Sequence, residues 1–409
     1  MITVEELTRA WRDAFLVSRN SLFTPASPQY WDRLEDSASS FPARTYIGHD
    51  ESKVVAWSSF LVRGLVLGGQ ATSAIKVAMA FAIGTLPDHQ RQGLGGKVWR
   101  AAEESLAQEA DGVLVYTGEG GKGYPSYRAM GYVPLLYPRA LQLTVSRERH
   151  AQKTGAPTAP FSESRGLSSR RGEVFATCYQ GYGGFMAGRP NSLDRWADVY
   201  FFYDLDSVGC IPQISWLENA TTGRWAAYAI WAGPIEKVDW KKGLVEIWEL
   251  AYAEDCDLES LCCVLQPAYT AARDGSGRVD WWAVPDHPLT GKMLALGFEE
   301  RPRDLCVLGK VFDPARRLND QLRTRKLGVR SVECAESGGR RVDIDIDGCG
   351  VEIEHDAAMR MVLGRSTASL EHQHGLLTIR PLQRAPAVLE ALDGALPVVP
   401  WCYFASEYI

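Results

Sequence analysis

The chain lacks the features of membrane, secreted and disulfide-bonded proteins. Its 409 residues contain no apolar run that approaches the roughly 20 residues of a membrane-spanning helix. The first 15 residues carry acidic side chains early and predict an amphipathic helix, not a signal peptide. The nine cysteines are an odd number, include no Cys-x-x-Cys pair and do not cluster, which argues against a disulfide scaffold or a zinc site. We therefore expect reduced thiols and a cytoplasmic location.

An excess of basic residues is also missing. Lys and Arg number 44 against 50 Asp and Glu, so the formal net charge is −6. This balance disfavours a nucleic-acid partner and is compatible with a cationic substrate. Hydrophobic residues make up 46% of the chain and charged residues 23%, as in an ordinary globular protein without a membrane partner. The length predicts two or three domains.

Residues 77–132 carry the most informative pattern. An apolar strand at 77–84 leads to a glycine-rich turn at 90–96 and then directly to a helix, whose apolar residues recur every four positions: Leu94, Val98, Ala102 and Leu106. A helix N-terminus presents free backbone N–H groups and the positive end of the helix dipole, and glycine lets an anion approach the backbone. This order of elements therefore predicts a site for a phosphate group.

Two better-known phosphate motifs do not fit the turn. A Walker A loop ends in Gly-Lys followed by Ser or Thr, whereas Lys97 is followed by Val98. A dinucleotide fingerprint needs three spaced glycines and an acid about 20 residues further on, and Gly93, Gly95 and Gly96 lack that spacing. A tight turn without a ligand is the alternative that the turn alone leaves open.

Two ordered motifs make the pattern specific. Gln90-x-x-Gly93-x-Gly95 resembles the Gln/Arg-x-x-Gly-x-Gly/Ala signature of the GCN5-related N-acetyltransferases, and Tyr127 followed by Gly131-Tyr132 resembles a later element of that family. The resemblance implies acetyl-coenzyme A, or another acyl-coenzyme A, as co-substrate, and no metal. It implies that backbone groups near Ile83 and Thr85 pair with the pantetheine arm. It also places the pyrophosphate on the turn, against Gln90, Arg91, Gln92, Gly93, Gly95 and Gly96.

The first domain is expected to span residues 1–146. Within it, a strand is predicted at 44–48, an antiparallel pair at 53–76 and a closing strand at 140–145. Residues 147–172 are rich in Ser, Arg, Ala and Pro and lack periodicity, so we expect a linker there.

Residues 173–312 repeat the order strand, helix, strand and Gly-Phe. Where the glycine turn should be, residues 252–257 contain acids and no glycine, and these acids would repel a pyrophosphate. We therefore expect a second, degenerate acetyltransferase-like domain that does not bind the coenzyme. An unrelated α/β domain is the alternative.

Residues 313–409 form the third predicted domain. Three domains in this order resemble the Eis family, in which an active and a degenerate acetyltransferase domain precede a sterol-carrier-protein-2-like domain. The match in the third domain is carried by residues 361–364 and 400–404. The resemblance implies an α/β (α+β) fold class, with two tandem mixed-sheet domains followed by the sterol-carrier-protein-2-like domain. We also expect a homo-oligomer.

Two metal-like patterns are set aside. Residues 343–354 match the letters of a calcium-binding EF-hand loop, but isoleucines fill the intervening positions and both flanks alternate like strands, which predicts a β-hairpin. His372 and His374 lie in a polar turn, where solvent exposure is the simpler expectation.

Acyl transfer from a thioester needs a neutral amine and a proton for the leaving thiolate. Tyr127 matches the acid of the family, and Tyr124 is a substitute because residues 122–125 look like an insertion. In the Eis family the C-terminal carboxylate reaches the active site of the first domain, and here that group belongs to Ile409. Glu407 or a water is the alternative base.

The amine-binding candidates are acids and aromatics of the first domain: Trp31, Asp32 and Glu119. We expect an N-acetyltransferase that acts on a primary amine of a small polycationic molecule, such as an aminoglycoside-like antibiotic. Direct attack in a ternary complex is favoured, since the first domain contains no cysteine nucleophile. Two alternatives remain open. One is an N-acyltransferase of a secondary-metabolite pathway with another acyl group or acceptor, and the other is a non-catalytic binding protein whose third domain holds an apolar ligand.

Overall fold

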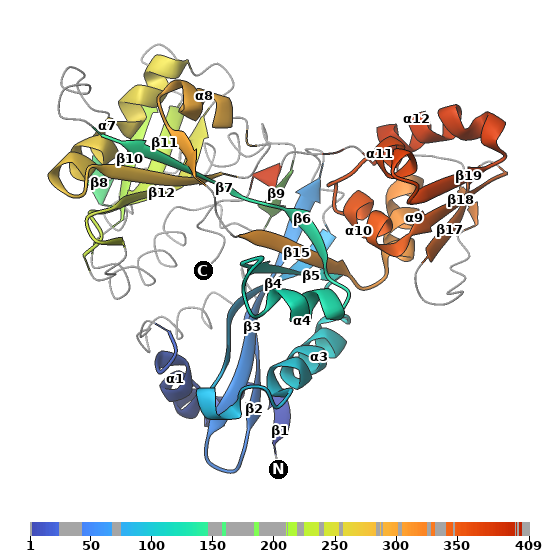
Figure 1. Ribbon diagram of the computed structural model, residues 1–409, viewed down its shortest axis with the longest axis horizontal. Coiled ribbons are helices and arrows are strands. Elements are labelled where there is room, and N and C mark those ends of the chain that lie inside the picture. The colour runs from blue at the N-terminus through green and yellow to red at the C-terminus, as the bar shows by residue number, and fades with distance from the viewer. Residues whose placement is uncertain are drawn as a thin grey trace.

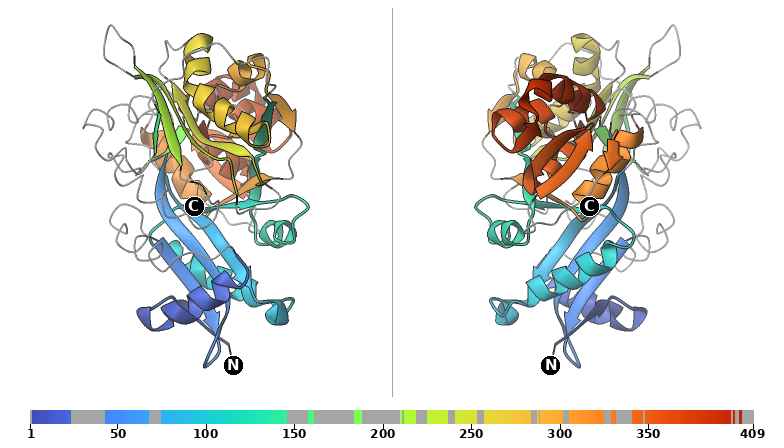
Figure 2. Two further views of the ribbon diagram at one scale, coloured as in Figure 1. Left: turned by 90° about the vertical axis from the view of Figure 1, so that its left-hand side faces the viewer. Right: turned by 90° about the vertical axis from the view of Figure 1, so that its right-hand side faces the viewer.

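In the computed structural model the chain forms three lobes, each built on its own β-sheet (Figures 1 and 2). In Figure 1 the first sheet lies below, the second at the upper left and the third at the right. The structure describes residues 2–23, 43–67, 75–145, 158–160, 184–187, 210, 212–218, 225–236, 241–252, 257–283, 287, 289–301, 305–324, 329–331, 341–346, 348–396, 398 and 401–402.

The first sheet has the order β1-β2-β3-β4-β5-β15-β6, and β9 and β20 are attached to it at β3. Strands β4 and β5 are parallel and are joined by the helix α3 (Leu94–Leu106), while α1 (Arg12–Asn20) and α4 (Tyr124–Ala129) complete this lobe. The strands are β1 (Thr3–Glu6), β2 (Ala43–His49), β3 (Val54–Leu67), β4 (Ile75–Thr85), β5 (Gly112–Thr117), β6 (Val133–Leu136), β9 (Gly184–Ala187), β15 (Cys306–Val311) and β20 (Trp401–Cys402).

The second sheet has the order β14-β7-β13-β12-β11-β10-β8. Its strands are β7 (Arg139–Thr144), β8 (Thr158–Pro160), β10 (Gln213–Glu218), β11 (Trp225–Ala232), β12 (Val245–Tyr252), β13 (Arg278–Ala283) and β14 (Glu299–Arg301). Helix α7 (Leu258–Asp274) joins the parallel pair β12 and β13, and α8 (Thr290–Ala295) follows. This is the predicted second strand–helix–strand unit. Strand β8 lies inside the segment expected to be a linker.

The third sheet is antiparallel throughout, in the order β16-β17-β18-β19. Its strands are β16 (Val329–Ser331), β17 (Arg341–Ile346), β18 (Cys349–Glu354) and β19 (Leu377–Arg380), and its helices are α9 (Pro314–Thr324), α10 (His355–Val362), α11 (Ala368–Gln373) and α12 (Ala385–Ala395). The predicted hairpin is confirmed, because Asp343 pairs with Glu352 across β17 and β18. The letters of the calcium pattern are therefore spread along a ladder, not around a loop.

The first two sheets exchange a strand. The predicted closing strand of the first domain is a strand, β7, but it pairs with β13 and β14 of the second sheet. In return β15, from the end of the second unit, enters the first sheet between β5 and β6. Figure 1 shows both strands crossing between the lobes. Sequence patterns predict strands but not their partners, because alternation is the same in either sheet.

The close pairing of β15 with β5 depends on Gly112. A Cβ atom at this position would lie 2.3 Å from the carbonyl oxygen of Lys310, so only glycine allows the two strands to approach this closely.

The predicted N-terminal helix is wrong for its first residues. Residues Thr3–Glu6 form β1, which pairs antiparallel with β2 from Thr3 opposite His49 to Glu6 opposite Tyr46. Helix α1 begins only at Arg12. Four residues satisfy either period, and the free edge of β2 offers backbone hydrogen bonds that decide for the strand.

The third lobe packs on the first sheet. One continuous apolar core joins Met79 and Leu114 of the first sheet to Leu318 of α9 and Met359 of α10. Helix α3 belongs to a different cluster, with β2 and β3, so its buried residues Val98 and Ala102 contribute nothing to this core. Burying each large apolar side chain contributes about 1.5–3 kcal/mol.

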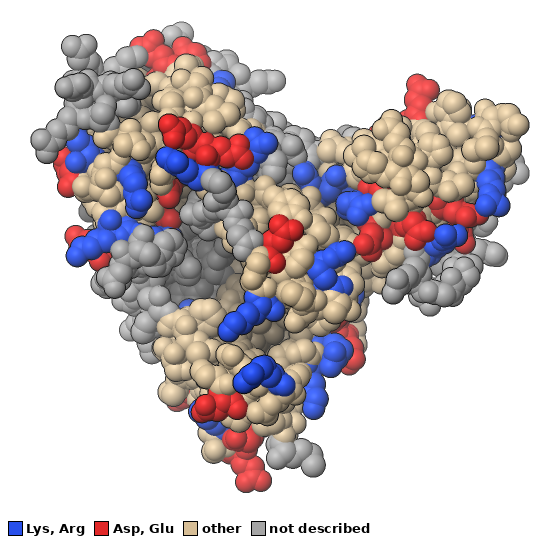
Figure 3. Space-filling view, in the orientation of Figure 1, with Lys and Arg blue, Asp and Glu red and all other residues tan. Residues whose placement is uncertain are grey.

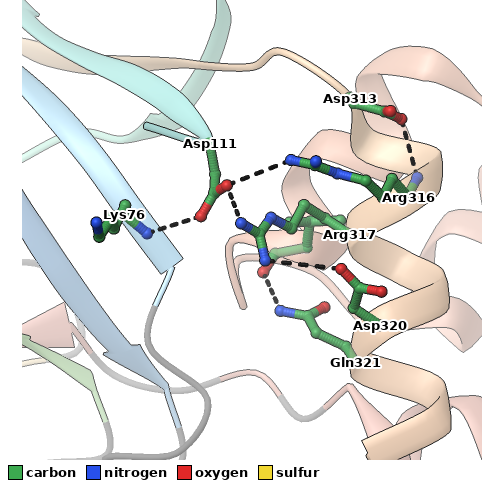
Figure 4. Close-up of polar contacts among 8 residues, drawn as sticks. Lys76, Asp111, Asp313, Arg316, Arg317, Asp320 and Gln321 are labelled. Carbon is green, nitrogen blue, oxygen red and sulfur yellow. Dashed lines mark hydrogen bonds and ion pairs between the residues drawn. The ribbon is translucent and has the colours of Figure 1, made fainter. Parts of the chain in front are cut away.

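A buried carboxylate, that of Asp111, stabilises the contact between the third lobe and the first sheet (Figure 4). Asp111, which precedes β5, accepts a hydrogen bond from the backbone N–H of Lys76 at 2.9 Å and is ion-paired with Arg317 of α9. A guanidinium nitrogen of Arg316 lies 3.6 Å from Oδ1 of Asp111, the oxygen atom that Arg317 contacts. Two guanidinium groups and a backbone donor thus compensate a carboxylate that is almost fully buried, as a buried charge requires.

Among the described residues, no helix has both the length and the apolar composition that crossing a membrane requires.

Gly112→Ala should destabilise the protein, because the added methyl group collides with the backbone of β15. Overpacking of this kind costs about 1–3 kcal/mol. Gly394→Ala in α12 is the matched control, since nothing lies within 4 Å of its added methyl group and alanine favours a helix. Urea unfolding followed by circular dichroism should show a lower free energy of unfolding for Gly112→Ala alone. Equal stability of the two variants would contradict the claim that β5 and β15 can approach each other only with glycine at position 112.

Candidate functional site

The parallel strands β4 and β5 separate at one end. Their pairing runs from Val77 opposite Gly112 to Ala80 opposite Val115, and β4 then continues to Thr85 paired with β3 but no longer with β5. Ala82 has a φ of 45°, and the pairing of β4 with β3 shifts register between Trp57 and Ser59. A bulge of this kind bends a strand away from its neighbour. The two strands therefore form a wedge that opens toward Thr85.

The predicted pantetheine partners Ile83 and Thr85 lie in this diverging part of β4. Residues 80–85 are all half-buried, whereas most of β4 before them is buried. The backbone of this part is thus available to an extended ligand between the strands, in the way that an added strand pairs with a sheet edge.

The glycine turn forms an open helix N-terminus beside the wedge. Gly93 is the N-cap of α3 with a φ of 74°, and no side chain caps the first backbone N–H groups of the helix. A Cβ atom at Gly95 would lie 3.1 Å from the hydroxyl of Thr85, so the turn sits directly on the end of β4. Free N–H groups and the helix dipole together favour an anion at this point.

The polar side chains of the turn support its backbone. The Gln90 amide donates to the carbonyl oxygen of Thr85 at 3.1 Å, and the Gln92 amide donates to that of Asp88 at 3.1 Å. Arg91 is exposed and has a φ of 60°. The two glutamines therefore shape the loop, and the free N–H groups of the helix and the charge of Arg91 remain for a ligand.

A further cation near the turn escaped the sequence analysis. The Nη1 atom of Arg100 lies 3.9 Å from the position that a Cβ atom at Gly96 would take. The spacing of four residues on a helix is the signal that places both on one face. Figure 3 shows basic side chains prevailing over the region of α3 and α4 on the face that it draws. Arg100 therefore adds positive charge to that of Arg91 near the open end of the helix.

In the second lobe, a side chain caps the N-terminus of the equivalent helix, α7. Asp257 is the N-cap of α7, and its carboxylate accepts a hydrogen bond from the backbone N–H of Ser260 at 2.7 Å. This hydrogen bond lowers the pKa of Asp257, so the carboxylate is ionised at neutral pH. The chain's own anion thus occupies the position that a phosphate would take. Residues 253–256 lie outside the described residues.

Tyr127 lies on α4 in an aromatic corner. Its ring centroid is 4.9 Å from that of Trp99 on α3 and 5.8 Å from that of Tyr132. Burial raises the pKa of Tyr127, which keeps the hydroxyl protonated at neutral pH. No described residue forms a hydrogen bond with this hydroxyl. A protonated hydroxyl of this kind is able to donate to a ligand.

The substitute acid Tyr124 is half-buried at the start of α4. The nearby Tyr137 is 45% exposed, and its hydroxyl is hydrogen-bonded with that of Tyr124. Tyr137 is a second hydroxyl that the sequence analysis missed, because it follows β6 and comes near α4 only in the folded sheet. Glu119 is exposed in the turn after β5 and adds a negative charge to this region.

A cysteine from outside residues 1–146 joins the first sheet. Cys306, at the start of the exchanged strand β15, lies opposite Thr117 at the end of β5. Burial raises the pKa of Cys306 to about 11. The thiol is therefore protonated at neutral pH and is a poor nucleophile, so its presence does not favour a covalent intermediate.

The end of the chain returns to the first sheet. Strand β20 pairs in parallel with β9, and β9 pairs antiparallel with the end of β3, where Gly64 lies opposite Ala187. Residues 403–409, which include the base candidates Glu407 and Ile409, lie outside the described residues, as do the amine-binding candidates Trp31 and Asp32. Within the described ranges, no group of His, Cys, Asp and Glu side chains is arranged to hold a metal ion.

No protein-family model matches the chain, and no curated protein matches it. Solved structures do. A GCN5-related N-acetyltransferase from Anabaena variabilis is 13% identical with a TM-score of 0.66, covering 98% of this chain and 99% of that one. A GCN5-related N-acetyltransferase from Kribbella flavida is 14% identical with a TM-score of 0.58, covering 98% and 99%. Eis1 from Mycobacterium abscessus is 14% identical with a TM-score of 0.54, covering 99% and 98%. At such identities the likeness concerns the fold, and it confirms the predicted class: over nearly its whole length, this chain has the mixed α/β fold of the GCN5-related N-acetyltransferases.

Proposed function

We propose that the protein is an N-acetyltransferase that moves an acetyl group from acetyl-coenzyme A to a primary amine of a small polycationic molecule, such as an aminoglycoside-like antibiotic. The carrying observation is the contrast between two equivalent helix N-termini. That of α3 is uncapped beside the wedge of β4 and β5, whereas that of α7 is capped by Asp257. One open and one closed phosphate position support coenzyme binding in the first lobe alone.

The first lobe offers partners for each part of the coenzyme. The N–H groups of residues 93–96 suit the pyrophosphate, with Arg91 and Arg100 as nearby cations. The backbone near Ile83 and Thr85 suits the pantetheine arm, which directs the thioester into the wedge toward Ala80. The coenzyme is a co-substrate, so no resident cofactor or metal enters this proposal.

The proposed reaction is direct attack in a ternary complex. The neutral amine attacks the thioester carbonyl carbon, the C–N bond forms, and the C–S bond breaks to release the thiolate of coenzyme A. Tyr127 gives its proton to that sulfur, and the proton that the attacking nitrogen loses as the amide forms restores the tyrosine hydroxyl. Burial raises the pKa of Tyr127, so the hydroxyl still carries its proton when the thiolate forms.

The amine begins as an ammonium ion and must lose a proton. The C-terminal carboxylate of Ile409 is our candidate for that base, with Glu407 or a water as the alternative. The attachment of β20 to β9 and the first sheet supports this proposal, because it brings residue 402 to the lobe that carries the wedge. Glu119, Trp31 and Asp32 are the proposed amine-binding groups, and the net charge of −6 suits a polycation. The third lobe as a sterol-carrier-protein-2-like domain and a homo-oligomeric state belong to the same proposal.

The activity is tested by mixing the protein with acetyl-coenzyme A and a panel of aminoglycosides and simple polyamines. Release of the free thiol of coenzyme A and a mass increase of one acetyl group on the amine are the expected results. A protein that binds coenzyme without turning over any amine would favour the non-catalytic alternative. Turnover only with longer acyl groups would favour the biosynthetic alternative.

Gly95→Asp should abolish coenzyme binding, because a carboxylate would lie where the pyrophosphate is expected. Like charges in contact cost several kcal/mol, so the loss of affinity should be about a hundredfold or more. Gly95→Asn has nearly the same size without the charge and should lose less. Isothermal titration calorimetry should also show one site per chain in the wild type. A second site, or unchanged affinity in Gly95→Asp, would contradict the proposal.

Tyr127→Phe should lower turnover by roughly 10²-fold while coenzyme affinity stays nearly intact, because the hydroxyl acts only when the sulfur leaves. Tyr124→Phe and Tyr137→Phe are the matched controls and should lose less than fivefold, on the order of a peripheral contact. Steady-state kinetics separate kcat from KM for each variant. If Tyr124→Phe shows the large loss instead, the acid is Tyr124.

Deleting residues 405–409 should leave a folded protein with normal coenzyme affinity and a large loss of acetyl transfer, because the proposed base is removed. Glu407→Gln is the control that separates that side chain from the terminal carboxylate. Melting temperature, coenzyme titration and turnover are the three measurements. Normal acetylation by the truncated protein would show that the tail is idle, and Glu119 would be the next candidate.

A further inference from the structure

A buried carboxylate lies beneath the aromatic corner of Tyr127. Glu103 of α3 is only 9% exposed, and three donors reach it: one from α3 itself, one from the loop before β6 and one from β15. The Tyr132 hydroxyl donates at 2.6 Å, the Trp99 indole N–H at 3.3 Å and the Lys310 ammonium at 2.9 Å. The Trp99 indole N–H also lies 3.0 Å from the Tyr132 hydroxyl oxygen. The four groups thus form one closed polar network.

This network builds the surface against which Tyr127 packs. The rings of Trp99 and Tyr132 are the described aromatic neighbours of Tyr127, and they meet each other at 5.9 Å between centroids. Both rings are almost fully buried, and both are held by hydrogen bonds to one carboxylate. Any shift of the Glu103 carboxylate therefore moves the two rings that fix the position of Tyr127.

Lys310 comes from the exchanged strand. It lies on β15 opposite Val113 of β5, and its ammonium is 5.6 Å from the centre of the Tyr132 ring. Among the described residues, it is the cation paired with Glu103. The strand that delivers it belongs in sequence to the end of the second unit, almost two hundred residues beyond Tyr127.

We propose that Lys310 is a positioning residue for acetyl transfer, which acts through Glu103 and the rings of Trp99 and Tyr132 on Tyr127. The second unit, whose own phosphate position is closed, then contributes to the reaction through one exchanged strand. This inference rests on the proposed function and adds a role to a residue that touches neither substrate.

The physical reason is the charge balance of a buried group. A buried carboxylate is stable when it is paired and hydrogen-bonded, and removing one partner leaves an uncompensated charge. Without Lys310 the carboxylate is drawn toward solvent, and it takes the hydrogen bonds of Trp99 and Tyr132 with it. Turnover is sensitive to small displacements of a catalytic group, whereas the coenzyme contacts at the opposite end of α3 are unaffected.

The test uses four variants of the full chain. Lys310→Met should lower kcat about tenfold, the scale expected for coupled groups in one network. KM and coenzyme affinity should stay unchanged. Glu103→Gln keeps an oxygen that accepts from Tyr132 and Trp99, and it should lose no more than about threefold. The double variant Lys310→Met/Glu103→Gln should recover to the level of Glu103→Gln, because no uncompensated charge is left. Lys310→Arg keeps the charge and should retain most activity.

Lys241→Met is the matched control. Lys241 pairs with the buried carboxylate of Glu246 on β12 at 2.7 Å, so it resembles Lys310 in burial and partner but belongs to the second lobe. It should lower the melting temperature to a similar degree and leave kcat unchanged. In a Tyr127→Phe background, Lys310→Met should cause no further loss, since its effect passes through the missing hydroxyl.

Three results would overturn the inference: wild-type kcat in Lys310→Met, no recovery in the double variant, or a further tenfold loss on top of Tyr127→Phe. If the wild type acetylates no amine at all, the proposed function fails instead, and the two failures are thereby distinct. Should Lys310→Met not fold, Tyr132→Phe removes one hydroxyl from the network with little change in packing. It should lower kcat severalfold, and an unchanged kcat would equally contradict the proposal.

Discussion

The antiparallel pairing of β15 with β5 is the interaction on which the rest of this structure depends. From Cys306 opposite Thr117 to Val311 opposite Gly112, it completes the sheet that carries the wedge. The same strand ends the second unit and leads directly into α9, where Arg317 is paired with Asp111 beside β5. One six-residue strand therefore joins all three lobes, and its backbone pairs on both sides, with β5 and with β6.

In the two acetyltransferase-like units, the N-cap residue decides whether the helix N-terminus is free to bind a phosphate. Both have a parallel strand pair joined by a helix, and both pairs separate beyond a short stretch of pairing. In the first unit a glycine with positive φ leaves the helix N-terminus open. In the second an aspartate fills it with its own carboxylate. An N-cap side chain and a bound phosphate compete for the same N–H groups, so a helix start serves one or the other.

The candidate site is assembled from segments far apart in the chain. The turn at 90–96 and α4 are close in sequence, but Cys306, Lys310 and the β9–β20 pair come from the second half. This arrangement sets the electrostatics of the site. Although the net charge of the chain is −6, basic side chains lie near the open N-terminus of α3. In the interior, the carboxylate of Glu103 is paired with Lys310, and the hydroxyl of Tyr127 and the thiol of Cys306 are protonated.

Local sequence patterns were enough to predict several helices and strands of this protein and the open N-terminus of α3. The apolar period of α3, the glycines that lead into it, the alternation of β17 and β18 and the acid-rich counterpart of the turn all depend on residues within a few positions of one another. Such patterns predict which element forms and which helix end is open. The choice of Tyr127 came instead from the resemblance of residues 127–132 to an acetyltransferase motif.

Tertiary structure alone decided which strands pair and which distant groups meet. Strand alternation is the same in either sheet, so β7 was assigned to the first domain and the place of β15 was not predicted. Thr3–Glu6 became a strand because the edge of β2 was free. For the same reason the thiol of Cys306, the hydroxyl of Tyr137 and the Lys310–Glu103 pair were invisible in the sequence. Their significance depends on a neighbour contributed by another segment, and for the thiol and the ion pair also on burial. Both exist only after the chain has folded.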